Sequence, residues 1–226
     1  MKLNLTFLLA SATAVSAVHA QSLPAVMKRM DAAAPGFRSM TARMDRVTHV
    51  AVINDNSAEV ATVRVLRGKA KEIRVALNFT EPDNKQVSIN DRKVEIFYPK
   101  MNTVQEWDLG KYKSLMDQFI LLGFGTGGKE LQKSYNVKYL KEDTVGGQKC
   151  SRLELDPKDP KVRQHYSRFE LCIAEAGGHP LLQKLIEPSG NYTGISYSSV
   201  KLNADLKPET MALNLPAGVK REYPQK

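Results

Sequence analysis

The chain has 226 residues, enough for one large domain with a sizeable hydrophobic core, and its formal net charge is +9 at pH 7. Its basic residues are dispersed along the sequence instead of clustered, which disfavours nucleic-acid binding. Two interpretations of the charge stay open, a solvated surface or attraction to an anionic lipid surface.

The beginning of the chain has the layout of a cleavable secretory signal peptide. Lys2 precedes a long apolar run that ends in the small-residue sequence Val18-His19-Ala20. We therefore predict removal of residues 1–20, which lowers the charge from +9 to +8 and leaves one domain over residues 21–226. Gln21, in place of a cysteine, argues against a lipid anchor at the new terminus. No second long apolar run follows, so we expect a soluble protein in the periplasm or outside the cell, with no nucleic-acid partner.

After this segment, the sequence predicts one short helix and then a series of strands. Residues 23–34 place apolar side chains at helical spacing and end at Pro35-Gly36. Residues 37–99 alternate like successive β-strands, separated by turn residues such as Asn54-Asp55-Asn56 and Pro82-Asp83-Asn84. This order predicts a meander of antiparallel strands.

One face of the predicted sheet is apolar. The strands over residues 73–79 and 168–173 both alternate between an apolar and a more polar face. The large apolar positions include Ile73, Val75, Leu77, Phe79, Phe169 and Leu171. A sheet of about ten such strands must curl, and its apolar concave face must be covered.

A second amphipathic helix is predicted over residues 111–122, with Met116 and Phe119 on its apolar side. Two short helices are few for so wide a sheet, so a curved sheet with a thin helical lid leaves room for an apolar cavity. A fully packed core is the alternative. Methionine suits a surface that accepts variable apolar guests as well as ordinary core filling. The methionines concerned are Met27, Met30, Met40, Met44, Met101 and Met116.

Residues 123–129, GFGTGGK, satisfy the spacing of an ATP-binding P-loop. Glu130 stands where a magnesium-binding hydroxyl is needed, and an exported protein has no supply of ATP, so we interpret the segment as a glycine-rich hinge or loop. His49, His165 and His179 are far apart in sequence and lack the spacing of metal ligands or of a catalytic triad. We predict no catalytic residue, no metal and no cofactor.

The two cysteines, Cys150 and Cys172, each stand in a stretch that alternates like a strand, which suits an exported disulfide. If the strands pair, the bridge closes a loop of about 20 residues and stabilises the fold by roughly 3 kcal/mol through chain entropy. Two buried free thiols are the alternative, and the spacing does not fit a CxxC redox site.

Several segments can be compared with a known family. In the first half they are Ile89-Asn90-Asp91 and IFYPKMNTVQEWDL. In the second half they are LLGFGTGGKEL, VKYLKED, GGQKCSRLELDPKDP, GGHPLLQKLIEPSGNYTGISYSSVKLNADL and MALNLPAGVKREYP. In content and order they resemble the LolA-like outer-membrane lipoprotein-sorting proteins, and the resemblance spans residues 23–224. None of these segments is a catalytic signature.

The resemblance implies a mainly β (α+β) fold, a single twisted antiparallel sheet that forms an unclosed half-barrel with a short helical lid over an apolar cavity. It implies a monomeric periplasmic carrier without enzymatic activity. Such a carrier holds acyl chains of lipoproteins or lipids, taken from an inner-membrane donor and delivered to an outer-membrane acceptor.

The resemblance also implies roles for individual residues. Ile96, Tyr98 and Trp107 are expected to line or rim the cavity. Arg67 is the nearest match to an arginine that contacts the lid and helps to hold the cavity closed, although Gly68 follows it where the family has proline. The complete set expected at the cavity and lid is Met30, Met40, Met44, Ile73, Val75, Leu77, Phe79, Ile96, Tyr98, Trp107, Met116, Phe119, Phe169 and Leu171.

Two other functions fit the sequence less well. The same fold can serve as an envelope sensor or interaction domain, which binds a partner protein and carries no cargo. An exported hydrolase has almost no support in the sequence. One scaffold serves several purposes, so the fold alone does not decide among these functions.

Overall fold

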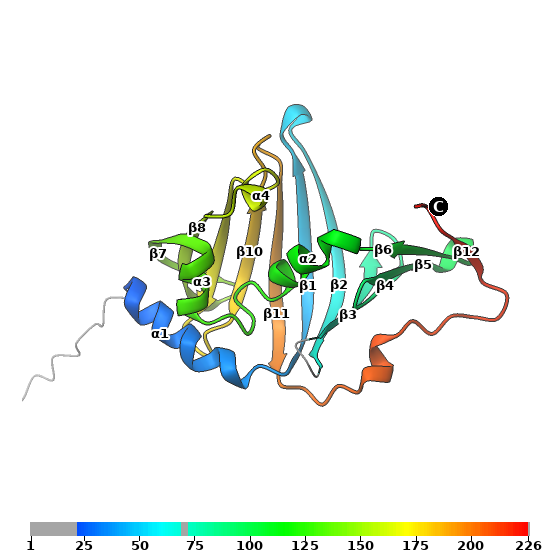
Figure 1. Cartoon of the computed structure of the whole chain (residues 1–226), viewed down its shortest axis with the longest axis horizontal. Helices are drawn as coiled ribbons and strands as arrows, with labels where there is room; N and C mark the ends of the chain where they lie inside the picture. Colours follow the sequence, from blue (N-terminus) through cyan, green and yellow to red (C-terminus); the bar gives the residue numbers. More distant parts are fainter. Residues whose placement is uncertain (1–21, 69–71, 226) are drawn as a thin grey trace, which may run out of the picture.

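The computed structural model describes residues 22–68 and 72–225, so the expected signal peptide at residues 1–20 lies outside the described residues. Their strands form one twelve-stranded sheet in the order β12-β6-β5-β4-β3-β2-β1-β11-β10-β9-β8-β7. Short helices cross its concave side (Figure 1). The sheet does not close on itself, which confirms the predicted mainly β half-barrel.

The first half of the sheet is a meander, and β11 joins it to the second half beside β1. Its strands are β1 Ser39–Val50, β2 Asp55–Arg67, β3 Ile73–Glu81, β4 Lys85–Asn90, β5 Lys93–Tyr98 and β6 Thr103–Asp108. The later strands are β7 Tyr135–Val145, β8 Gln148–Pro157, β9 Arg168–Ala174, β10 Pro180–Ile186, β11 Tyr192–Leu202 and β12 Lys220–Glu222.

The β1–β2 hairpin forms the longest arm of the sheet. Its two strands pair without interruption from Ser39 opposite Leu66 to Val50 opposite Asp55. Asn54 closes the turn in the left-handed backbone conformation, with φ of 48°, which asparagine tolerates better than most residues. Figure 1 shows the tip of this hairpin rising above the neighbouring strands.

Strand register places the apolar positions on the concave side. Residues directly opposite each other in adjacent strands share a face, so the pairs Met44–Ala61 and Ala61–Phe79 continue one apolar row. In the second half of the sheet, Leu153 opposite Leu171 belongs to another apolar row on the same side. These rows form two packed clusters, one over β1–β4 and one that joins α1 and α3 to β7–β10.

The helices are α1 Leu23–Ala33, α2 Lys113–Ile120, α3 Gly128–Ser134 and α4 Pro160–Arg163. The first two confirm the predicted helices within three residues at each end, with 3-10 turns extending α1 at its end and α2 at its start. The expectation of only two helices is wrong, because α3 and α4 are also present. The first turn of α3 is stabilised from outside, since Lys129 N donates to Asp31 Oδ1 of α1 at 3.1 Å.

The disulfide is confirmed, and the alternative of two free thiols is wrong. Cys150 of β8 and Cys172 of β9 are bonded, with 22 residues between them in sequence and 5.4 Å between their Cα atoms. Both side chains are fully buried on the convex side, where Ala174 and Leu181 complete a small third cluster.

The two edges of the sheet differ. At one edge, β12 pairs with β6 in parallel, so the expectation of a purely antiparallel sheet is wrong at this pairing. The chain reaches this edge across the convex side of the sheet, where Ser88 Oγ donates to the Met211 carbonyl at 2.8 Å. Gln225 attaches the segment after β12 to β6, because its side-chain amide accepts a hydrogen bond from Asp108 N at 2.7 Å and donates one to Asp108 O at 3.1 Å. The other edge is β7, which carries a bulge between Tyr139 and Lys141.

Candidate functional site

The concave face of the sheet is covered by a lid made of α1, α2, α3 and residues 121–127, which we call the lid loop. Helix α2 spans the two apolar clusters, because Ile120 packs against the first and Leu115 and Phe119 pack against the second. The Phe119 ring lies 4.9 Å from the Tyr166 ring and 5.4 Å from the Phe169 ring, measured between centroids. The lid is therefore held to the sheet mainly by apolar and aromatic contacts.

The lid loop also has a polar attachment that is buried. Gln183 of β10 donates its amide to the Leu122 carbonyl of the loop, and Tyr197 of β11 donates its hydroxyl to Gln183 Oε1 at 2.7 Å. Burial raises the pKa of Tyr197, so its hydroxyl keeps its proton and can donate even at alkaline pH. The three groups form one chain of hydrogen bonds from the sheet to the lid.

Arg67 lies at the end of β2, beneath the lid loop. Its Nη2 donates to the Gly125 carbonyl at 3.4 Å, and its guanidinium lies 5.9 Å from the centroid of the Phe37 ring. The structure thus places Arg67 against the loop that follows α2. Its role in holding a cavity closed remains a prediction.

Glycines in the GFGTGGK segment allow the lid to approach the rest of the protein closely. Gly125 has φ of +70°, and a Cβ there would lie 2.8 Å from Phe37 Cδ1. A Cβ on Gly128 would lie 2.6 Å from Met27 Cα, so α3 can contact α1 only because this position has no side chain. The interpretation of the segment as a glycine-rich loop is confirmed up to residue 127, and its last two residues begin α3.

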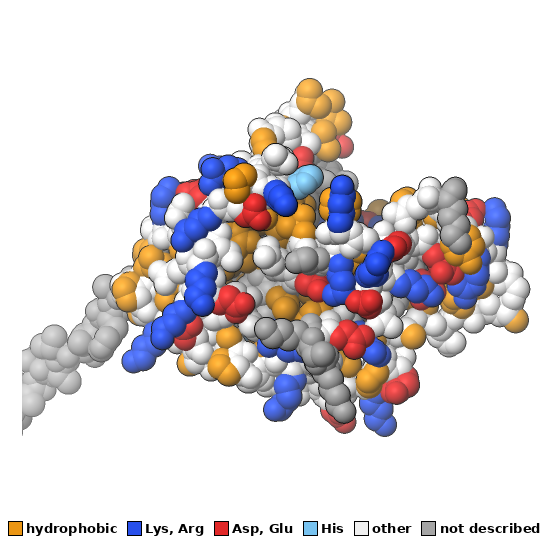
Figure 2. All heavy atoms as spheres, viewed as in Figure 1, with side chains coloured by type: hydrophobic (Ala, Val, Ile, Leu, Met, Phe, Trp, Pro, Cys, Tyr) orange, Lys and Arg blue, Asp and Glu red, His pale blue; other side chains and the backbone are white. Residues whose placement is uncertain are grey.

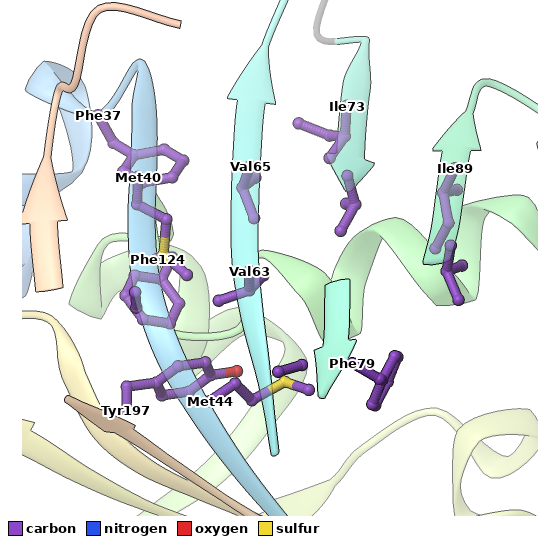
Figure 3. Packing of buried hydrophobic residues seen from close by; sticks show 14 residues of the cluster. Phe37, Met40, Met44, Val63, Val65, Ile73, Phe79, Ile89, Phe124 and Tyr197 are labelled. Atoms are coloured by element: carbon purple, nitrogen blue, oxygen red, sulfur yellow. The ribbon is translucent and has the colours of Figure 1, made fainter. Parts of the chain in front are cut away.

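The expected cavity residues divide into buried and half-buried groups. Most of the strand positions are buried in the two clusters. Figure 3 shows Met40 and Met44 near Phe124 of the lid loop, with Ile73 and Phe79 farther across the sheet. The buried residues are Met30, Met40, Met44, Ile73, Val75, Phe79, Phe169 and Leu171. The half-buried residues are Leu77, Ile96, Tyr98, Trp107, Met116 and Phe119. Their role in ligand binding remains a prediction.

Several apolar side chains on the concave face are only partly covered. The first cluster is contacted by Leu77, Ile96 and Ile195, and the second cluster is contacted by Leu185. All four side chains are half-buried. Figure 2 shows hydrophobic side chains gathered in the middle of this face, with charged side chains on either side. Apolar patches rimmed by polar side chains are typical of surfaces that bind a ligand or a partner.

Space also remains beneath the lid. A cavity of about 370 Å³ lies between α2 and α3 and is lined in part by Leu121, Leu122 and Leu131. A smaller cavity of about 170 Å³ lies between α1 and the lid loop, where Met30 and His179 are among the lining residues. The larger one is near the lower limit of small-molecule sites, which is about 300 Å³.

Trp107 occupies a different place from the other expected residues. It lies opposite Val94 and therefore on the concave side of the sheet, but in β6, next to the β12 edge. There it lines a surface pocket of about 340 Å³ together with Arg92, Tyr223 and Gln225. The sequence left the orientation of this residue open, and the register settles it.

Sequence reasoning missed the residues that attach the lid. Gln183 is two residues before Leu185 and therefore lies on the same, apolar face of its strand. A polar residue at such a position was the signal in the sequence for a buried hydrogen bond. Tyr197 and Phe124 gave no signal, because an aromatic residue in a strand or loop is ordinary. The rings of these two residues meet edge to face, with centroids 5.2 Å apart.

Two further observations bear on the kind of site. Among the described residues, no group of three or more His, Cys, Asp or Glu side chains is placed to hold a metal ion. No helix in the described parts of the chain is both long enough and apolar enough to cross a membrane.

Comparison with known proteins identifies the family. The family model described as "Outer membrane lipoprotein carrier protein LolA" matches residues 69–212. No curated protein sequence matches the chain.

Three solved structures share the fold at low sequence identity. A crystal structure of MucB is 16% identical over 84% of this chain and 62% of its own, with a TM-score of 0.53. An uncharacterized conserved protein from Thermus thermophilus is 14% identical over 90% of this chain and 99% of its own, with a TM-score of 0.54. LprF from Mycobacterium bovis is 11% identical over 82% of this chain and 94% of its own, with a TM-score of 0.50.

The alignment with MucB spans about three-fifths of that protein's length, 62%. At these identities the likeness shows the shared fold and no more. The family match covers well over half of the chain, and the half-barrel with its lid agrees with it. The chain belongs to the family of the outer membrane lipoprotein carrier protein LolA.

Proposed function

We propose that this protein is a periplasmic carrier that binds acyl chains of lipoproteins or lipids on its concave face and delivers them toward the outer membrane. The observation that carries the proposal is the apolar concave face beneath a lid that is attached mainly by apolar contacts. The description of the family, a carrier of outer membrane lipoproteins, supports the same reading. The proposal includes no catalytic step and no cofactor.

Binding is driven by removal of apolar surface from water. Each buried methylene contributes about 0.8 kcal/mol, so one acyl chain gains enough to displace weak lid contacts. The half-buried side chains Leu77, Ile96 and Leu185 are the first contacts of an entering chain. Met30, Met116 and Phe119 then separate as the lid lifts, and the released chain passes to a membrane acceptor.

The proposal covers the whole exported chain. Residues 1–20 direct export and are removed, and residues 21–226 act as one lipid-binding domain. The donor lies in the inner membrane and the acceptor in the outer membrane, and the carrier works as a monomer.

The first test is native mass spectrometry of residues 21–226 purified from a bacterial periplasm, followed by extraction and identification of bound molecules. Acyl-chain cargo at one or two molecules per protein supports the carrier. A protein that carries no lipid and also takes up no added diacylated lipopeptide contradicts it. That result shifts the interpretation to a domain that binds a partner protein.

A pair of variants on one strand tests where the cargo binds. Leu77→Glu places a charge on the concave face, and Asn78→Glu places the same charge on the exposed convex face of β3. We expect the first variant to lose lipopeptide uptake by at least about tenfold, because a buried charge opposes an acyl chain. The second is expected to bind like the wild type. Equal uptake by both variants, each with a native circular dichroism spectrum, contradicts binding on the concave face.

A further inference from the structure

Three charged side chains project from the apolar concave face near its hairpin end. Arg46 of β1 lies opposite Glu59 of β2, two positions from Ala61, and Ala61 lies opposite Phe79. Lys85 of β4 lies opposite Phe79 on the other side. Since opposite residues share a face, Arg46, Glu59 and Lys85 all point to the concave side around Phe79. We call these three residues the concave charge cluster.

Glu59 contacts both Arg46 and Lys85, and the two cations lie over the Phe79 ring. Arg46 Nη2 bonds Glu59 Oε2, and Lys85 Nζ lies 2.5 Å from Glu59 Oε1. The Arg46 guanidinium carbon lies 5.5 Å from the centroid of the Phe79 ring, and Lys85 Nζ lies 4.4 Å from it. Phe79 is only 5% exposed, so the two cations cover it.

One carboxylate serves two cations, so the concave charge cluster carries a net charge of +1. Arg46 Nε is buried and has no hydrogen-bond partner among the described residues. Burial lowers the pKa of Arg46, and burial followed by repulsion from Arg46 lowers the pKa of Lys85. Both cations are therefore partly desolvated, and the single Glu59 carboxylate neutralises only one of the two positive charges.

The other groups that act on Lys85 are Tyr98 and Asp83. Both favour its charged form, because the Asp83 carboxylate and the phenol oxygen of Tyr98 attract the ammonium. Asp83 is itself occupied, because Lys100 Nζ lies 2.5 Å from its Oδ1 and both side chains are exposed. Tyr98 is half-buried on the same face as Ile96, and its hydroxyl can donate to an anion.

Apolar side chains flank the concave charge cluster. Ile195 lies directly opposite Arg46 on β11, Leu77 lies two positions from Phe79, and Ile96 lies on β5 opposite Val87, two positions from Lys85. Ile195, Leu77 and Ile96 are all half-buried. A net positive cluster set within a half-covered apolar surface is complementary to an amphiphile that has an anionic group at one end of its acyl chain.

We propose that Arg46 and Lys85 bind the anionic head group, a phosphate or carboxylate, of the acyl-chain cargo, with Glu59 holding both cations in place until the cargo arrives. The inference rests on the proposed carrier function and adds the chemistry of the head group to it. The alternative is a cross-strand ion network that only stabilises the sheet.

The test compares two probes with the same acyl chain, anionic palmitoyl-lysophosphatidylglycerol and uncharged monopalmitoylglycerol, by isothermal titration calorimetry. Wild-type protein is expected to bind the anionic probe at least about tenfold more tightly, because charge-assisted hydrogen bonds are added to equal apolar contacts. Lys85→Gln is expected to lose most of that preference while its affinity for monopalmitoylglycerol stays the same. Lys100→Gln removes the same charge from an exposed lysine and is expected to keep the preference.

A second variant separates the two roles of the cluster. Glu59→Gln removes the competing carboxylate, so head-group binding predicts a severalfold tighter affinity for the anionic probe. A purely structural network predicts no gain in that affinity and only a loss of stability in urea. If Lys85→Gln does not fold, Glu59→Gln alone decides the question.

The outcomes distinguish failure of this inference from failure of the proposed function. Equal affinity of wild-type protein for both probes overturns the head-group site and leaves the carrier intact. Failure to bind either probe overturns the carrier as well. Inorganic phosphate at millimolar concentration serves as a competitor. If phosphate displaces palmitoyl-lysophosphatidylglycerol and leaves the binding of monopalmitoylglycerol unchanged, the head-group site is supported. Tight binding of phosphate alone, with no preference for the anionic lipid, identifies a site for free phosphate and overturns the lipid head group.

Discussion

At the scale of single residues, Gly125 shows how the lid fits the sheet. Its left-handed backbone and its distance from Phe37 both exclude a side chain. Arg67 donates to the carbonyl of the same residue. The contact between β2 and the lid loop therefore depends on one position that only glycine can occupy without a shift of its neighbours.

Gly125→Ala is expected to destabilise the protein by about 2–4 kcal/mol, the sum of backbone strain and the overlap with Phe37. Gly110→Ala is the control, because Gly110 has φ of +50° but no atom within 4 Å of the added Cβ. We expect the control to lose only about 1 kcal/mol from backbone strain. Urea denaturation of both variants gives the two values, and equal losses contradict the proposed overlap.

Single residues also show what alternation can and cannot predict. The pattern at residues 73–79 correctly places Ile73, Val75 and Phe79 in the buried core. It does not reveal that Phe79 lies beneath Arg46 and Lys85, because those residues come from strands paired only in the folded chain. Burial follows from local sequence, whereas the charge around a buried residue depends on register.

At the scale of elements, the lid is held by few polar contacts. The hydrogen bonds from Tyr197 through Gln183 to the Leu122 carbonyl join β11, β10 and the lid loop. Gln183 is 3% exposed, so this chain is shielded from water. The lid loop is thus secured by a small number of hydrogen bonds and by apolar contacts, an arrangement compatible with the opening that the proposed carrier function requires.

Replacing Gln183 tests this attachment. Gln183→Ala leaves both the Leu122 carbonyl and the Tyr197 hydroxyl without their partner, and we expect a loss of about 1–3 kcal/mol in stability. Tyr197→Phe removes only one of the two bonds and is the milder control. Hydrogen–deuterium exchange is expected to rise in residues 121–127 more in the first variant than in the second. Unchanged exchange in this segment in Gln183→Ala means that Gln183 does not hold the lid loop.

The elements themselves were largely predictable. Strand alternation and turn residues located the meander, and helical spacing located α1 and α2. Helix α3 escaped prediction because it begins in a glycine-rich run and is stabilised by Asp31 of another helix. The parallel β12 also escaped it, because three residues give no alternation and their partner lies more than a hundred residues earlier.

At the scale of the whole molecule, buried tyrosines make stability sensitive to alkaline pH. Burial raises the pKa of Tyr135 from its ordinary value of 10.0 to about 12. The unfolded chain therefore releases this proton at a lower pH than the folded chain does, and stability falls as the pH rises from 10 toward 12. Below pH 10 the contribution of Tyr135 is fully present.

We expect wild-type protein to lose about 1 kcal/mol through Tyr135 between pH 9 and pH 11. Tyr135→Phe has no ionisable group at this position and is expected to lose correspondingly less over the same interval. Urea denaturation at pH 9, 10 and 11 measures the difference. The same pH dependence in both proteins assigns the alkaline sensitivity to other groups.

The whole sheet is open, and an open sheet ends in two strands whose backbone groups can pair with another chain. Here one edge strand is the three-residue β12, and the Gln225 amide after it is hydrogen-bonded to Asp108 of β6. The other edge strand is β7, which contains a bulge and carries Lys138 and Lys141. Short, bulged and lysine-bearing borders are poor templates for adding a further strand. The sheet can therefore remain open and lined by apolar side chains, while its edge strands disfavour edge-to-edge polymerisation of the protein.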